Sequence, residues 1–130
     1  MHKTIQPQGW PRPKGYANGV LAEGRMLFIA GQVGWNAQER FDSDDFVAQT
    51  EQALRNIVAV LHEAGAKAEH IARMTWYVTS KSDYLDRLAE IGEVYKRVIG
   101  ATYPAMSLVQ VAGLVEVGAK VEIEATAVVP

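Results

Sequence analysis

Two carboxylates near the C-terminus have a spacing that suits proton transfer. Residues 121–128 read Val-Glu-Ile-Glu-Ala-Thr-Ala-Val, and this alternation of apolar and polar side chains predicts a strand. Because side chains alternate between the two faces of a strand, Glu122 and Glu124 share one face. A carboxylate can accept the proton of a water that attacks an electrophilic carbon. The spacing fits an acid and base couple and a solvated surface pair equally well.

Three other residues could line a site for a small molecule. Gly31 has no side chain to keep a ligand away from its backbone N–H. Trp35 lies among polar residues, where it could stack on a planar ligand or pack at a contact between subunits. Tyr16 could donate its hydroxyl to a substrate, or it could anchor the N-terminal segment. The residues alone leave these alternatives open.

Several other chemistries find no support in the sequence. His2, His62 and His70 lack the spacing that sets two imidazoles on one helical face, so we expect no metal site. The chain has no cysteine, which excludes a disulfide, a thiol nucleophile and a cysteine-based zinc site. It also lacks a GxGxxG or Walker-type phosphate loop and a GxSxG serine motif. We therefore expect no cofactor.

The N-terminal part of the chain predicts paired strands after an irregular arm. Residues 1–14 hold three of the five prolines and show no periodicity, which indicates an irregular arm. The apolar runs 20–22 and 26–30 flank Glu23-Gly24-Arg25, which predicts a hairpin with a glycine-containing turn. Residues 31–40 are then expected to form a loop.

Two helices and three further strands are expected downstream. Ser43 and the two aspartates after it predict a helix start, and Gly65 predicts its end. Residues 71–79 alternate as a strand does. A second helix is predicted from about residue 82 to Gly100, and its apolar stripe holds Leu85, Leu88, Ile91, Tyr95 and Val98. Strands at 103–112 and 121–128 complete the chain.

This element order predicts one α+β domain over residues 1–130, with both helices on one face of a sheet. The opposite face would carry Thr75, Tyr77, the two glutamates, and either Met106, Leu108 and Gln110 or their alternates. That mixture is too apolar for a solvated surface and too polar for a core. We expect this face to associate with other copies of the chain.

Bulk composition limits the classes of partner and compartment. The formal net charge of -2 leaves no excess of cations to neutralise a phosphate backbone, so we expect no nucleic-acid partner. No long apolar run or basic apolar leader is present, so we expect no membrane partner. The absence of cysteine suits a reducing cytoplasm, which is the expected location.

The segment Tyr103-Pro104-Ala105-Met106-Ser107, the strand at 121–128, and the pairs Gly15-Tyr16 and Gly31-Gln32 resemble the RidA family, also called YjgF or endoribonuclease L-PSP type. The resemblance covers nearly the whole chain. It implies a chorismate-mutase-like fold and a homotrimer whose sheets line a central barrel, with three clefts between adjacent subunits. It also implies that Glu122 positions the attacking water and that Tyr16 lines the cleft.

Met106 departs from the pattern of the deaminase members, which read Pro-Ala-Arg-Ser and use the arginine to grip the substrate carboxylate. Methionine cannot form that charge-assisted pair, and it would instead pack in the cleft. Arg25, Arg40 and Arg73 could replace the cation, or they could be solvated surface charges.

Two functions are compatible with this departure. The resemblance implies a hydrolase that deaminates an imine or enamine to a carbonyl compound and ammonia, on substrates other than simple 2-imino acids. The alternative is a non-catalytic trimer that binds a small metabolite in the same cleft. A ribonuclease would need a basic surface, which the charge balance does not provide.

Overall fold

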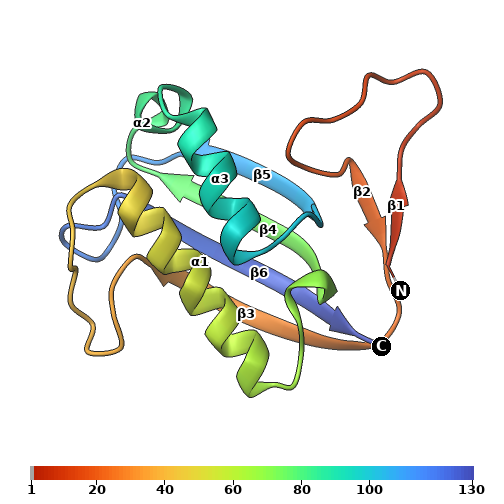
Figure 1. Cartoon of the computed structure of the whole chain (residues 1–130), viewed down its shortest axis with the longest axis horizontal. Helices are drawn as coiled ribbons and strands as arrows, with labels where there is room; N and C mark the ends of the chain where they lie inside the picture. The colour runs from red at the N-terminus through yellow and green to blue at the C-terminus, as the bar shows by residue number, and fades with distance from the viewer. Residues whose placement is uncertain (1) are drawn as a thin grey trace.

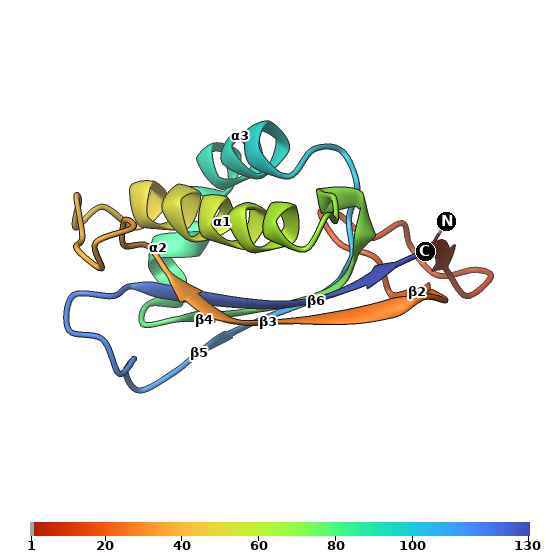
Figure 2. The same ribbon diagram turned by 90° about the horizontal axis from the view of Figure 1, so that it is seen from below.

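The computed structural model describes residues 2–130, and helices cover one face of a four-stranded sheet. The sheet has the order β3-β6-β4-β5, and β4 and β5 are parallel while the other pairs are antiparallel. Its strands are β3 (Arg25–Val33), β4 (Ile71–Val78), β5 (Ala105–Gln110) and β6 (Val121–Val129). The predicted α+β fold, with helices on one sheet face, is confirmed (Figure 2).

Three helices and a short 3-10 turn connect the strands (Figure 1). They are α1 (Phe46–Glu63), the 3-10 turn η1 (Ala68–His70), α2 (Lys81–Leu85) and α3 (Leu88–Val98). Parallel strands need a long crossover connection, and α2 and α3 provide it between β4 and β5. No helix within residues 2–130 is long and apolar enough to cross a membrane.

The ends of α1 follow from local chemistry. Asp45 is the N-cap, and its carboxylate accepts a hydrogen bond from the Ala48 N–H at 3.0 Å. The hydroxyl of Ser43, the residue at which the sequence predicts the helix start, instead accepts the Asp45 N–H at 3.0 Å. Gly65 follows the helix with a φ of 72°, a left-handed conformation that glycine adopts without steric cost.

The core lies between this helix layer and the sheet. The predicted alternation of β4 and β6 is confirmed. The large apolar side chains that are fully buried come from α1, β4 and β6: Leu54, Ile57, Leu61, Met74, Trp76, Val78, Val121 and Ile123. Trp76 pairs with Ile123, and Thr75 pairs with Glu124 on the opposite sheet face. The period of two therefore separates an apolar helix-facing set from an open face that carries both polar and apolar side chains.

The second predicted helix is divided into α2 and α3. Arg87 interrupts it with a φ of -131° and a ψ of 33°, and its guanidinium binds Asp45 at 2.6 Å and Glu90 at 2.8 Å. The break reorients the chain, so the prediction that Leu85 and Leu88 join the buried stripe is wrong. These side chains are 56% and 49% exposed.

The N-terminal segment also differs from the prediction. Residues expected to be irregular contain β1 (Lys3–Ile5), which pairs with β2 (Gly19–Leu21) in a separate two-stranded sheet. The predicted hairpin between residues 20–22 and 26–30 is therefore wrong. Strand β3 pairs with β6 along nearly its whole length and extends to Val33, into the predicted loop.

The register of β5 decides which of its residues face the helices. Met106 pairs with Met74 and Leu108 pairs with Trp76, so both lie on the buried side. The alternates Ser107 and Val109 occupy the open face. Phe28 on this face is 71% exposed.

Candidate functional site

Glu122 and Gly31 meet on the open face of the sheet. Strand β3 changes register between Ile29 and Gln32, and Glu122 pairs with Val33 just beyond this irregularity. The Glu122 carboxylate lies directly over the Gly31 backbone, and a Cβ atom at residue 31 would overlap it. Glycine thus permits the carboxylate to approach the strand closely, and any side chain at this position would displace it.

Tyr77 and Glu124 form a second pair on the same face. The Tyr77 hydroxyl donates a hydrogen bond of 2.5 Å to the Glu124 carboxylate. This bond, followed by desolvation and the negative charge of Glu124, raises the pKa of Tyr77 above its ordinary value. The phenol therefore keeps its proton at neutral pH. Glu124 has a structural partner, whereas no hydrogen bond to the Glu122 carboxylate occurs within residues 2–130.

This difference separates the roles of the two carboxylates. Glu124 already accepts a hydrogen bond from Tyr77, so part of its capacity to accept hydrogen bonds is used. The Glu122 oxygens lie next to the Gly31 backbone, where no side chain blocks the approach of a water or ligand. The sequence alone could not distinguish the two, because both have the same spacing and face.

Tyr16 and Met106 lie together at the β5 edge of the sheet. Both line a cavity of about 290 Å³, whose wall also includes Arg73 and Ser107. The chain is attached here by the Ala17 N–H, which donates to the Pro104 carbonyl at 2.9 Å. Of the three arginines considered from the sequence, Arg73 is therefore the one that shares a cavity with Tyr16 and Met106.

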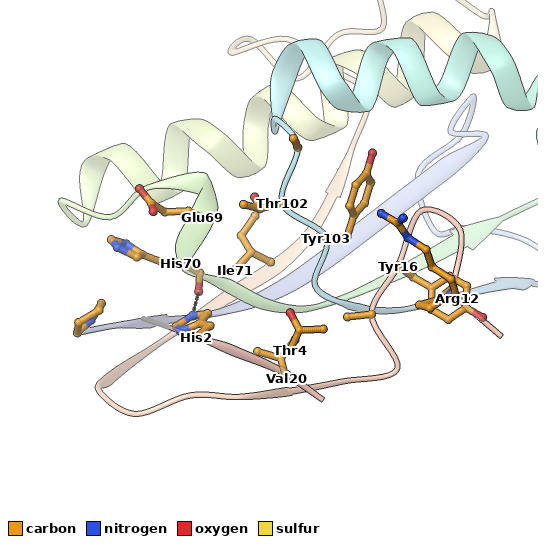
Figure 3. Close-up of a pocket in the computed structure, with 14 residues that line it drawn as sticks. His2, Thr4, Arg12, Tyr16, Val20, Glu69, His70, Ile71, Thr102 and Tyr103 are labelled. Atoms are coloured by element: carbon orange, nitrogen blue, oxygen red, sulfur yellow. Dashed lines mark hydrogen bonds between the residues drawn. The ribbon is translucent and has the colours of Figure 1, made fainter. Parts of the chain in front are cut away.

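Tyr16 also borders a larger cavity of about 400 Å³ between the N-terminal segment and the domain. Figure 3 shows Arg12 beside Tyr16, and Tyr103 standing above them from the segment that precedes β5. The ring of Tyr103 stacks on Tyr95 with centroids 5.3 Å apart, and Tyr95 donates to the Thr102 carbonyl at 3.0 Å. This wall of the cavity is thereby fixed.

The Glu122 and Gly31 pair does not meet the Tyr16 and Met106 pair within one chain. Gly31 and Glu122 lie on the open face, whereas Met106 shares its face with Met74 under the helices. A single chain therefore brings the predicted water-handling group close to Gly31, and Tyr16 close to Met106, but leaves the pairs apart.

Trp35 is held in the loop after β3. Its ring packs against Phe41 with centroids 5.8 Å apart, and its carbonyl accepts a hydrogen bond of 2.9 Å from the Asn56 side chain. The neighbouring Gly34 is pressed against Gln49 of α1, where a Cβ atom would overlap the helix backbone. The tryptophan thus has an intramolecular packing partner in addition to its half-exposed surface.

Comparison with known proteins identifies the family. The sequence profile of the family described as Endoribonuclease L-PSP matches residues 11–129. The chain belongs to this family, the RidA family. The putative reactive intermediate deaminase TdcF of Escherichia coli is 38% identical, with 98% of each chain covered. The 2-iminobutanoate/2-iminopropanoate deaminase of Escherichia coli is 35% identical, again with 98% of each chain covered.

Solved structures of RidA-family proteins share the fold. The Rid-family protein YyfB of Yersinia pestis has a TM-score of 0.87 and 35% identity, with 98% of each chain covered. Escherichia coli TdcF with bound serine has a TM-score of 0.70 and 36% identity, with 98% of this chain and 99% of that chain covered. The two Escherichia coli relatives that are named as deaminases support a generic imine-deaminase role in this family.

Proposed function

We propose that this protein hydrolyses an imine or enamine to a carbonyl compound and ammonia at a cleft between subunits of a homotrimer. The observation that carries this proposal is the Glu122 carboxylate, held over the Gly31 backbone and without a hydrogen bond from any of residues 2–130. Relatives named as reactive intermediate deaminases support the reaction class. The separation of Glu122 from Met106 within one chain supports a site that two subunits complete.

Glu122 acts on water in this reaction. Its carboxylate accepts a proton from the water as the water oxygen bonds to the imine carbon and the C=N electron pair moves to nitrogen, and it passes this proton to the nitrogen to give a carbinolamine. Glu122 then accepts the hydroxyl proton of the carbinolamine and delivers it to the amino group. The C–N bond breaks, ammonia leaves, the oxygen forms the carbonyl, and Glu122 is again ionised.

Met106 determines which substrates fit. A thioether cannot form the two charge-assisted hydrogen bonds by which arginine fixes a carboxylate. The cleft next to Tyr16 instead offers an apolar, polarisable surface. We therefore assign substrates other than simple 2-imino acids, with Trp35 available to an aromatic group. The ligand is a small molecule rather than nucleic acid, and the reaction takes place in the cytoplasm.

The test is ammonia release from imines and enamines generated in solution, with and without a carboxylate at the imine carbon. Glu122→Gln keeps the shape but cannot accept the proton, and we expect it to lower the rate about 100-fold or more. Glu124→Gln is the matched control on the same strand face, and most of the activity should remain. Met106→Arg should shift activity toward 2-imino acids.

The same assay separates enzyme from binding protein. Acceleration that survives Glu122→Gln would refute the assigned role of this carboxylate. No acceleration by an intact trimer across the whole panel would favour the non-catalytic alternative, a trimer that binds a small metabolite in the same cleft.

A further inference from the structure

A further cavity lies inside one chain, between α3 and the side of the sheet that faces the helices. Its volume is about 280 Å³, and four aromatic side chains line it together with Met106: Trp76, Tyr84, Tyr95 and Tyr103. We call it the aromatic cavity. Pockets for drug-sized ligands begin at about 300 Å³, so this one suits a molecule with a single ring.

The aromatic walls of this cavity are held in place by their own contacts. Tyr95 and Tyr103 stack with centroids 5.3 Å apart and planes within 9° of parallel, and Tyr84 meets Trp76 at 74° with centroids 6.3 Å apart. Burial raises the pKa of Tyr84 and of Tyr95 above the ordinary value, so both phenols remain neutral. Rings fixed in this way offer faces and edges to a planar ligand.

Trp76 contributes a buried hydrogen-bond donor without a partner. Its side chain is 2% exposed, and its indole N–H finds no acceptor among residues 2–130. Indole can only donate, and a buried donor that stays unpaired costs free energy. Because the nitrogen itself is covered, an acceptor reaches it only when a lining side chain moves. Met106 lines the same cavity, and methionine is unbranched and adaptable.

Gly92 leaves one wall of the cavity open. It lies in the middle of α3, where glycine is less stable than alanine. Its φ is not positive, so the backbone does not require glycine there. A Cβ at this position would have no neighbouring atom within 4 Å. The fold gives no reason for glycine at residue 92, whereas a ligand in the adjoining space does.

Charge decides which aromatic ligands fit. Lys14 is exposed and is the charged side chain at this cavity, and no acidic side chain of residues 2–130 lines it. Aromatic rings by themselves attract cations, but the ammonium of Lys14 opposes a second positive charge. An anionic group on the ligand is therefore favoured where the cavity opens to solvent.

We propose that the aromatic cavity binds a single-ring aromatic carboxylate that carries a hydrogen-bond acceptor on the opposite side of the ring. The acceptor meets the indole N–H of Trp76, and the carboxylate points toward Lys14. Every lining residue comes from one chain, so the inference depends neither on the homotrimer nor on Glu122. Met106 also lines the cavity that holds Tyr16, which places the bound ring beside the cleft of the proposed function.

Pyridine-4-carboxylate is the probe, and benzoate is its matched control. The two anions have the same shape and differ only in the ring nitrogen, which is unprotonated at neutral pH and accepts a hydrogen bond. The three tryptophans of the chain give three indole N–H signals in a ¹H–¹⁵N NMR spectrum of the full-length protein. Pyridine-4-carboxylate should shift the Trp76 signal and bind roughly 5-fold more tightly than benzoate, the effect of one hydrogen bond.

Two variants separate the donor from the charge. Trp76→Phe removes the N–H and keeps an aromatic ring, so it should bring the affinities for the two acids to the same value. Loss of packing alone would weaken both acids and keep their ratio. Lys14→Gln should weaken both acids equally, by up to about 5-fold, because an exposed charge contributes little.

A third variant fills the cavity. Gly92→Leu places a side chain in the open space beside α3, and it should weaken the binding of both acids at least about 10-fold. Leucine has a higher helix propensity than glycine, so the helix should be retained, as circular dichroism can verify. Ala89→Leu is the control, because Ala89 is exposed on the same helix and does not line the cavity.

The titrations also show what would overturn the proposal. Equal affinity of the wild-type protein for the two acids, or an unmoved Trp76 signal, would remove the donor role of Trp76. Tighter binding of benzylamine than of benzoate, or no binding of either acid, would refute the ligand class. Ammonia release is a separate readout: a protein that binds the probe but releases no ammonia from any imine keeps this inference and loses the proposed function.

Discussion

The four-stranded sheet and the N-terminal arm, here residues 2–22 with β1 and β2, show how much a strand depends on its neighbours. Strands β4 and β6 are buried on one face by α1 and paired on both sides, so their alternation has one stable register. The arm also has apolar residues, but its two strands pair only with each other and make few contacts with the rest of the domain. Local pattern therefore decides the faces of these sheet strands, while the pairing of β1 with β2 joins residues far apart in the sequence and is not set by local pattern.

The largest expected contrast is between two tryptophans, one in each region. Trp76 in β4 is 2% exposed and meets the edge of the Tyr84 ring with centroids 6.3 Å apart. Trp76→Ala should lower the free energy of unfolding by about 3–5 kcal/mol, because it leaves a cavity in the core. Trp10 in the arm is 59% exposed, and Trp10→Ala should change it by less than about 0.5 kcal/mol.

Urea denaturation of both variants measures this difference. Equal losses would mean that the arm contributes to the same cooperative core as the sheet, contrary to the comparison.

A second contrast uses two glycines. Gly31→Ala places a methyl group where the Glu122 carboxylate lies, whereas a Cβ at Gly19 in the arm meets only Ile5, at an ordinary 3.5 Å. Displacement of a reacting group by about 1 Å can lower a rate about 100-fold, so we expect a loss of this size in ammonia release for Gly31→Ala. Gly19→Ala should retain the wild-type rate.

Rates for the two variants should be measured at equal folded fraction, checked by circular dichroism. Full activity in Gly31→Ala would show that the position of the Glu122 carboxylate over this strand does not matter for the reaction.

The smallest expected effect concerns acid stability of the domain. Hydrogen bonds from Arg87 and then from the Ala48 N–H lower the pKa of Asp45 below 3.8. A lowered pKa in the folded state means that this stabilisation is present above about pH 3.8 and is lost as pH falls through the lower folded value. Asp45→Ala should therefore cost about 1 kcal/mol at pH 7 and less under acidic conditions.

Thermal unfolding between pH 7 and pH 3 checks this dependence, with Asp44→Ala as the neighbouring control. Asp44 is exposed and is not the helix cap. A constant difference between Asp45→Ala and wild type at every pH would contradict the role given to the ionised carboxylate. The arm has no acidic residue, so arm variants should show no such acid limb of their own.

The sequence alone determined the layered fold and much of its detail. Helix α1 follows from its apolar period, its aspartate-rich start and its terminal glycine, and the faces of β4 and β6 follow from alternation. These features depend on residues that are neighbours in the chain. The family followed from short motifs in the same way, and the sequence profile confirms it.

The candidate site was only partly predictable. Glu122, Gly31, Tyr16 and Met106 were identified from the sequence, but not the contacts that pair them. The hydrogen bond between Tyr77 and Glu124 gave no signal beyond two polar residues on predicted strands. Such contacts join residues far apart in sequence, and no local propensity encodes them.

Tertiary structure alone decided the partner of β2, the face of β5 and the place of Glu122. A shift of one residue moves every side chain of a strand to the other face, so the pairing of Met106 with Met74 determined that this residue faces the helices. The irregularity in β3 likewise set Gly31 beneath the Glu122 carboxylate. Register is fixed by hydrogen bonds to a neighbouring strand, and the identity of that neighbour is a property of the folded chain.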